Sequence, residues 1–138
     1  MKKNPMKKLF LIFAISLICI NKVYSMDSLN KYSEQILAKD QIDPNDEVYL
    51  YFRCAAVFEF AEINFKDEIK DESSSYRNNS LTVFILVIDK IKQKLKLSEN
   101  EAITKAKKES TALLESYKEK RIDFVRDDLF FCKQLFFN

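Results

Sequence analysis

Glycine, histidine and tryptophan are absent from this chain of 138 residues. Phosphate-binding loops, dinucleotide-binding turns and nucleophile elbows all need glycine, because other residues rarely adopt the backbone conformations of those motifs. Without histidine there is neither a Ser-His nor a Cys-His catalytic pair, and no imidazole can bind a metal. These absences argue against an enzyme and against a bound metal or cofactor. The length predicts one small domain.

The N-terminus has the three regions of a secretory signal peptide. Four lysines among the first eight residues precede the apolar run Leu9–Ile20, in which only Ser16 is polar. That run is too short to cross a bilayer as a helix, which takes about 20 apolar residues. We therefore predict a signal peptide over residues 1–25, with cleavage between Ser25 and Met26.

Two other interpretations of this segment are a lipoprotein, with the lipid on Cys19, and an uncleaved membrane anchor. A lipoprotein site needs a small residue before the cysteine, whereas Ile18 is bulky. An anchor needs a longer apolar run. We therefore expect no stable membrane anchor after cleavage, and we expect the mature chain to be periplasmic or secreted.

Cleavage changes the sign of the net charge. The whole chain carries +2, but residues 1–25 contain five of its 23 basic side chains and none of its 21 acidic ones. Residues 26–138 therefore carry a net charge of −3. A mildly acidic domain has little affinity for a polyphosphate backbone, so we do not expect nucleic acid as a partner.

Two cysteines remain after cleavage, Cys54 and Cys132. In an oxidising compartment the simplest outcome for two cysteines is one disulfide. The alternative is a pair of buried free thiols, which a reducing compartment would favour. Because the signal peptide predicts export, we expect the disulfide.

Residues 26–138 predict a single all-α domain, a small bundle of about four helices. A first short helix should follow Asp27 or Ser28. A second should begin at Pro44, because Asp43 can cap it and proline suits the first helical position. This second helix is the most apolar, with 12 hydrophobic residues among the 14 of Val48–Ala61. We therefore place it at the centre of the bundle.

The third and last helices are predicted from a loop and a capping motif. Asp71–Ser80 resembles a loop, with Ser80 as the cap of the third helix. Ser98 and Glu101 have the spacing of a capping box, so the last helix should begin at Ser98 and can reach about Phe136, with a kink near Lys118–Arg121. Helical spacing predicts the buried face of the third helix from six residues: Leu81, Phe84, Ile85, Ile88, Ile91 and Leu95.

A strand is the alternative in two places, Val48–Phe52 and Leu81–Ile88. Both are short apolar runs, and periodicity alone does not distinguish a buried strand from a buried helix in such runs. The absence of glycine and the single proline after residue 25 favour helix in both places. The prediction is a second helix and a last helix that one disulfide joins.

Two groups of charged residues are candidate sites. Arg53, Arg121 and Asp128 fall on apolar stripes, which predicts a buried or rim ion pair more readily than a binding site. Glu59 and Glu62 lie one turn apart on the apolar helix. Paired acids can catalyse glycoside hydrolysis, but from separate elements across a substrate, so these two are expected to face water. No catalytic residue is predicted.

In its size, export signal, helices and single crosslink the chain resembles two kinds of small periplasmic helical protein. These are the immunity proteins that neutralise type VI secretion amidase effectors, and acid-stress chaperones. The resemblance implies an exported, bacterial periplasmic module that binds another protein, such as an inhibitor or immunity-type protein. A periplasmic chaperone or adaptor with exposed aromatic surface is one alternative. A carrier of a small apolar ligand between helices is the other.

Overall fold

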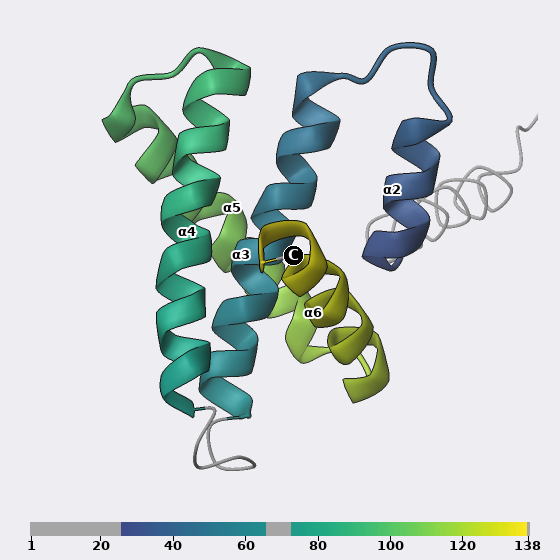
Figure 1. Cartoon of the computed structure of the whole chain (residues 1–138), viewed down its shortest axis with the longest axis vertical. Helices are drawn as coiled ribbons and strands as arrows, with labels where there is room; N and C mark the ends of the chain where they lie inside the picture. The colour runs from purple at the N-terminus through teal and green to yellow at the C-terminus, as the bar shows by residue number, and fades with distance from the viewer. Residues whose placement is uncertain (1–25, 66–72, 138) are drawn as a thin grey trace, which may run out of the picture.

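The computed structural model of the chain describes residues 26–65 and 73–137 (Figure 1). The predicted signal peptide and the cleavage residue Ser25 lie outside these residues, and Met26 is the first residue described. All regular structure in the two described ranges is helical, which confirms the predicted fold class. The helices are α2 (Leu29–Leu37), α3 (Pro44–Asn64), α4 (Ser73–Leu95), α5 (Glu99–Lys118) and α6 (Ile122–Phe137).

Three helices begin where the sequence predicts. The side chain of Ser28 caps α2 by accepting a hydrogen bond from the backbone N–H of Lys31. Asp43 caps α3, and Pro44 is its first residue. At α5 both bonds of the capping box of Ser98 are present. These starts are local in origin, since each cap satisfies an N–H group that has no partner within the helix.

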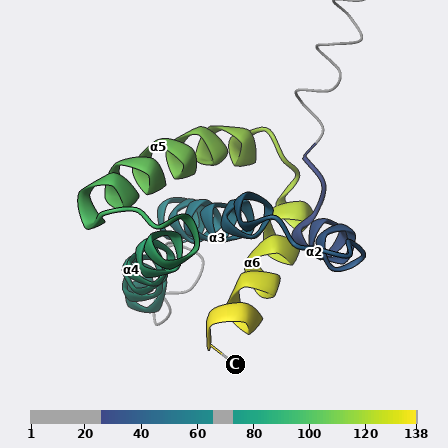
Figure 2. The same ribbon diagram turned by 90° about the horizontal axis from the view of Figure 1, so that it is seen from above.

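The central element is α3, as predicted from its composition. In the view of Figure 2, α5 passes over it, α4 lies on one side, and α2 and α6 lie on the other. The side chains from Tyr51 to Phe58 are all buried, so this helix is covered on nearly every side. Three small residues in its middle, Cys54, Ala55 and Ala56, leave room for neighbouring helices to approach. The strand alternative is wrong both here and in α4.

The predicted single last helix is two helices, which is why the described ranges hold five helices rather than about four. The chain leaves α5 at Lys118 in a tight final turn, in which the N–H of Glu119 donates to the carbonyl of Ser116 and the N–H of Lys120 donates to the carbonyl of Tyr117. No proline or glycine causes this break. The turn redirects the chain, so that α6 packs against α3 and α2 instead of continuing along α5 (Figures 1 and 2).

The start and the buried face of α4 also differ from the prediction. The helix already begins at Ser73, so residues 73–80 are helical and do not belong to a loop. Of the six predicted residues, Ile91 is fully buried, together with Val83 and Val87, and Phe84, Ile88 and Leu95 are partly buried against the core. Leu81 and Ile85 are 62% and 52% exposed. The sequence offers two apolar faces in α4, and the face with the shorter valines packs against α3. The face with Leu81 and Ile85 is left at the surface.

A lysine ends α4 in a left-handed conformation. Lys96 has φ of 53°, and the N–H of Leu97 donates to the carbonyl of Lys92. This is the arrangement of a Schellman motif, in which glycine usually occupies the left-handed position. The chain contains no glycine, so a lysine adopts that conformation.

Candidate functional site

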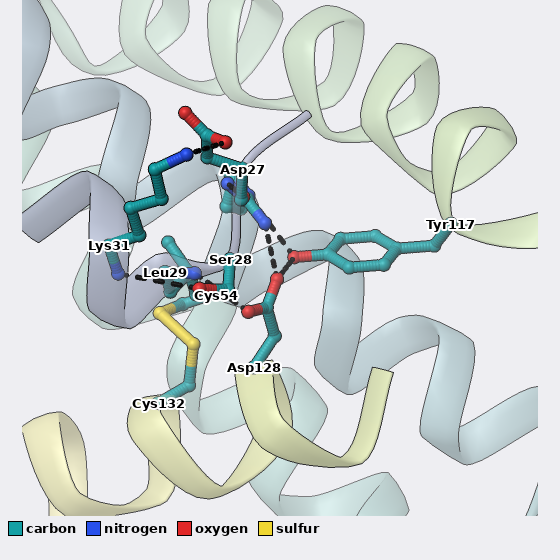
Figure 3. Close-up of polar contacts among 9 residues, drawn as sticks. Asp27, Ser28, Leu29, Lys31, Cys54, Tyr117, Asp128 and Cys132 are labelled. Atoms are coloured by element: carbon teal, nitrogen blue, oxygen red, sulfur yellow. Dashed lines mark hydrogen bonds and ion pairs between the residues drawn. A yellow bond between two sulfur atoms is a disulfide. The ribbon is translucent and has the colours of Figure 1, made fainter. Parts of the chain in front are cut away.

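The predicted disulfide between Cys54 and Cys132 is present and joins α3 to α6 (Figure 3). The two Cα atoms are 5.5 Å apart, within the usual range for a disulfide. Both cysteines are fully buried. The crosslink therefore fixes α6 against the central helix from inside the core.

Arg53 and Asp128, two of the three charged residues singled out in the sequence, form a buried ion pair beside this disulfide. Nη2 of Arg53 donates to Oδ2 of Asp128, and each side chain is only 1% exposed. Arg121 takes no part in it. This residue lies in the turn before α6, where its side chain is 87% exposed and pairs with Asp123 at 3.3 Å. The helical stripe that predicted an inward-facing Arg121 does not pass through the turn between α5 and α6.

Three further groups complete the network around this pair (Figure 3). The hydroxyl of Tyr117 donates to Oδ2 of Asp128 at 2.6 Å and accepts from Nε of Arg53 at 3.2 Å. The backbone N–H of Leu29 donates to Oδ1 of Asp128 at 2.8 Å. The carbonyl of Asp27 accepts from Nη1 of Arg53. The network thus ties the start of α2 to α3, α5 and α6.

The sequence gives one signal for Tyr117 that pattern analysis missed. Tyr117 falls on the apolar stripe of α5 and is fully buried. A buried tyrosine hydroxyl needs a hydrogen-bond partner, so its position predicts a polar group nearby. The other two groups are the backbone carbonyl of Asp27 and the backbone N–H of Leu29. Their role could not be predicted from residue types, because nearly every residue has such groups.

The charged and polar groups of this network are stabilised by their neighbours inside the core. Burial raises the pKa of Tyr117 well above its usual value, which keeps the hydroxyl protonated as a donor. The guanidinium of Arg53 lies 6.0, 5.7 and 5.8 Å from the ring centres of Tyr49, Tyr117 and Phe124. In the described ranges, every buried side-chain nitrogen and oxygen has a hydrogen-bond partner. Each nitrogen and oxygen of the cluster thus has at least one partner, and these contacts join α2, α3, α5 and α6.

Two possible functions can be tested directly on the described residues. In 26–65 and 73–137, no three His, Cys, Asp or Glu side chains are grouped so that they could hold a metal ion. No described helix combines the length and the apolar character that crossing a membrane requires.

An apolar groove of about 320 Å³ lies between α2, α3 and α6. Exposed apolar side chains rim it, since Leu37 is 73% exposed and Ile42 and Leu135 are each 44% exposed. Its position depends on the disulfide, which fixes α6 against α3. The residues that line the apolar groove are Ser33, Ile36, Leu37, Ile42, Glu47, Leu50, Tyr51, Phe131 and Leu135.

A second groove, of about 440 Å³, contains the paired acids Glu59 and Glu62. The sequence predicted that they would simply face water, but both line this groove. Burial, and next to it the charge of Glu62, raise the pKa of Glu59 above its ordinary value. The residues that line this acidic groove are Ala55, Glu59, Glu62, Ser80, Leu81, Phe84, Lys107, Ser110 and Thr111.

Comparison with known proteins identified no relative of this chain. A scan against protein-family models, a search of curated proteins and a search of solved structures each found no match to the chain. The buried network and the two grooves are therefore assigned from their geometry alone.

Proposed function

We propose that residues 26–138 form an exported, periplasmic module that binds another protein, as an inhibitor or immunity-type protein does. The apolar groove between α2, α3 and α6 carries this proposal. Leu37, Ile42 and Leu135 present large apolar side chains to solvent around a concave surface. Exposed apolar surface of this kind costs free energy in water, and a protein partner would remove that cost.

Rigidity supports the same function. The apolar groove is framed by three helices that the disulfide and the network of Arg53 and Asp128 hold in place. A binding surface that is fixed before the partner arrives loses little conformational entropy on association. The saturated network leaves no free acid, base or nucleophile within it, which supports a binding role over a catalytic one.

Export rests on two independent features. The N-terminal segment has basic, apolar and cleavage regions in the order of a signal peptide. A disulfide joins the only two cysteines of residues 26–138, and such a bond persists in an oxidising compartment. Together they support the periplasm as the location.

A photo-crosslinking amino acid placed at Leu37 tests the proposal in the exported protein. We expect a discrete adduct with one partner protein, and no such adduct when the crosslinker replaces the exposed Lys90 of α4. Leu135→Ser should reduce the adduct formed from position 37, because it removes apolar surface on the opposite rim. Adducts with many unrelated proteins would instead support the chaperone or adaptor function. Crosslinking from both positions alike would contradict a specific surface.

The apolar groove also supports a second function, the transport of a small apolar ligand. A volume of about 320 Å³ between helices is at the lower end of what ligand sites enclose. Native mass spectrometry of the exported protein distinguishes this function from the first. A bound lipid that Leu37→Ser and Leu135→Ser release would support the carrier, and a ligand-free mass would contradict it.

A further inference from the structure

The acidic groove lies apart from the apolar groove. Its floor is α3, and its walls are α4 and α5. Figure 2 shows α4 on the side of α3 away from α2, and α5 passing over α3. The walls separate because α5 crosses over α3 while α4 continues beside it (Figures 1 and 2). A ligand can therefore occupy the acidic groove without touching the surface assigned in the proposed function.

The floor of the acidic groove carries negative charge that no ion pair among the described residues balances. Glu59 and Glu62 lie one turn apart on α3, and within the described ranges neither forms an ion pair or a side-chain hydrogen bond. Lys107 is the one basic residue in the lining, but it is exposed on the α5 wall and pairs with neither carboxylate. Two like charges in a groove that is partly shielded from water favour the approach of a cation.

An apolar wall stands next to these carboxylates. Leu81 is 62% exposed, and Phe84 is half-buried beside it. Ile85, at 52% exposure, continues the same surface of α4 beyond the groove. Leu81 and Ile85 lie on the face of α4 that the core does not use, whereas Phe84 also packs against the core. A ligand that is complementary to this groove therefore has a positively charged group next to an apolar group.

We propose that the acidic groove binds a segment of a partner protein in which a lysine or arginine lies beside an apolar side chain. The cation is held by Glu59 and Glu62, and the apolar side chain rests on Leu81 and Phe84. A volume of about 440 Å³ accommodates side chains of the partner, and charge complementarity selects basic ones. This surface is additional to the apolar groove and does not depend on the function proposed there.

A short amphipathic peptide of leucine and lysine is the probe, and the same peptide with glutamate in place of lysine is its control. Binding is followed through the backbone amide signals of the mature, oxidised protein by NMR. We expect the lysine peptide to shift amides of residues 55–62, 80–84 and 107–111, and the glutamate peptide to shift none of them. Raising the salt concentration should weaken binding, because the carboxylates are reached from solvent.

Two pairs of substitutions separate this site from general attraction to an acidic protein. The variant with Glu59→Gln and Glu62→Gln should bind the lysine peptide about tenfold more weakly, the loss expected for one strong electrostatic contact. The variant with Glu34→Gln and Glu119→Gln loses the same charge at exposed positions elsewhere and should bind as the wild type does. Circular dichroism of both variants confirms that they are folded.

The apolar wall is tested with Leu81→Ser, which should also weaken binding. Equal affinity in the two glutamine variants would overturn the proposal, as would peptide-induced shifts confined to the apolar groove or absent altogether. Leu37→Ser serves as a further control. This variant should bind the lysine peptide as the wild type does. The test of the acidic groove is therefore independent of the crosslinking experiment at position 37.

Discussion

A charged residue in the middle of the most apolar helix needs compensation, and Arg53 receives it from Asp128, Tyr117 and the carbonyl of Asp27. A buried charge without a partner destabilises the folded state by roughly several kcal/mol. Removal of one member of a buried pair therefore leaves the other as an unpaired charge with that penalty. Asp128 contributes both carboxylate oxygens, one to Arg53 and Tyr117 and the other to the N–H of Leu29. The stability of this residue cluster therefore depends on its completeness more than on any single contact.

Asp128→Ala should destabilise the protein by about 3–5 kcal/mol, because it leaves Arg53 as an unpaired buried charge. Urea unfolding of the oxidised protein measures the loss. Arg53→Met combined with Asp128→Leu removes both charges, so the double variant should lose clearly less than the two single variants together. Losses that simply add would mean that the two residues act independently.

Glu59→Gln should change how stability depends on pH. Burial raises the pKa of Glu59 above the ordinary value of 4.5, so the folded chain favours its protonated form. As the pH rises through that range, ionisation costs more in the folded chain than in the unfolded one, and the wild type loses stability relative to the variant.

The stability of Glu59→Gln relative to wild type should therefore rise between about pH 4 and about pH 7, by less than about 1 kcal/mol because the side chain is partly exposed. Thermal unfolding across this range measures it. The same substitution at the exposed Glu34 is the control for loss of one negative charge. An equal rise in that variant would show that the environment of Glu59 is not the cause.

Among the helices, the starts of α2, α3 and α5 were predictable and the packing was not. Ser28, Asp43 and Ser98 cap their own helices, so the signal is complete within a few residues of sequence. The break after Lys118 lies where the sequence predicts a kink, but no helix-breaking residue there indicates that the helix ends. The break lets α6 reach α3, to which Cys132 is bonded. These are distant contacts, which a pattern of local residues does not report.

The candidate site was predictable to the same extent. Arg53 and Asp128 stood out because charges on apolar stripes need partners. Arg121 appeared equivalent to them only while α5 and α6 were taken as one helix. In α4 two apolar faces compete, and the choice between them depends on the shape of α3. The sequence of α4 alone could not decide it.

The disulfide between α3 and α6 should act as one unit. Cys132→Ser and Cys54→Ser should each lower the free energy of unfolding by roughly 4 kcal/mol, since the bond closes a loop of 78 residues. The double variant should lose no more than either single one, and each should bind an apolar dye more strongly. Titration of free thiols in the exported wild type is the further check. Additive losses, or two reactive thiols, would contradict the crosslink.

Lys96→Gly should stabilise the end of α4. Lys96 adopts a left-handed conformation that costs a residue with a side chain roughly 1 kcal/mol and costs glycine little. Thermal unfolding should show a gain of up to about 1 kcal/mol, after the greater flexibility of glycine in the unfolded chain is offset. Gln93→Gly, within the regular helix, is the matched control and should lose about 0.5–1 kcal/mol. A loss at position 96 would mean that the lysine side chain itself contributes to the fold.

At the scale of the whole molecule, α3 separates two grooves of different character. The apolar groove lies towards α2 and α6, and the acidic groove lies between α4 and α5. The apolar groove contains exposed leucines, which water solvates poorly, and the acidic groove contains two neighbouring carboxylates of like charge. A domain of 113 residues can thus present two surfaces to one partner or to two.

Export should produce a mature chain that begins at Met26. N-terminal sequencing and the intact mass of the exported protein measure this, and the mature chain should migrate as a mildly acidic protein with a net charge of −3. A retained N-terminus, or a lipid on Cys19, would contradict the predicted cleavage and indicate a membrane anchor instead.

A chain that crosses a membrane with its N-terminus first delivers Cys54 to the oxidising side 78 residues before Cys132. Once cleavage has removed Cys19 with the predicted signal peptide, Cys54 has no partner within its own chain during that interval, because residues 26–138 contain no third cysteine. Its one hazard is a bond to another molecule. Once Cys132 arrives, only one intramolecular pairing exists, so the chain needs an oxidant but no enzyme to reshuffle bonds within it. Helices α4 and α5 lie between the two cysteines in the sequence, so they reach the oxidising side before α3 can be crosslinked to α6.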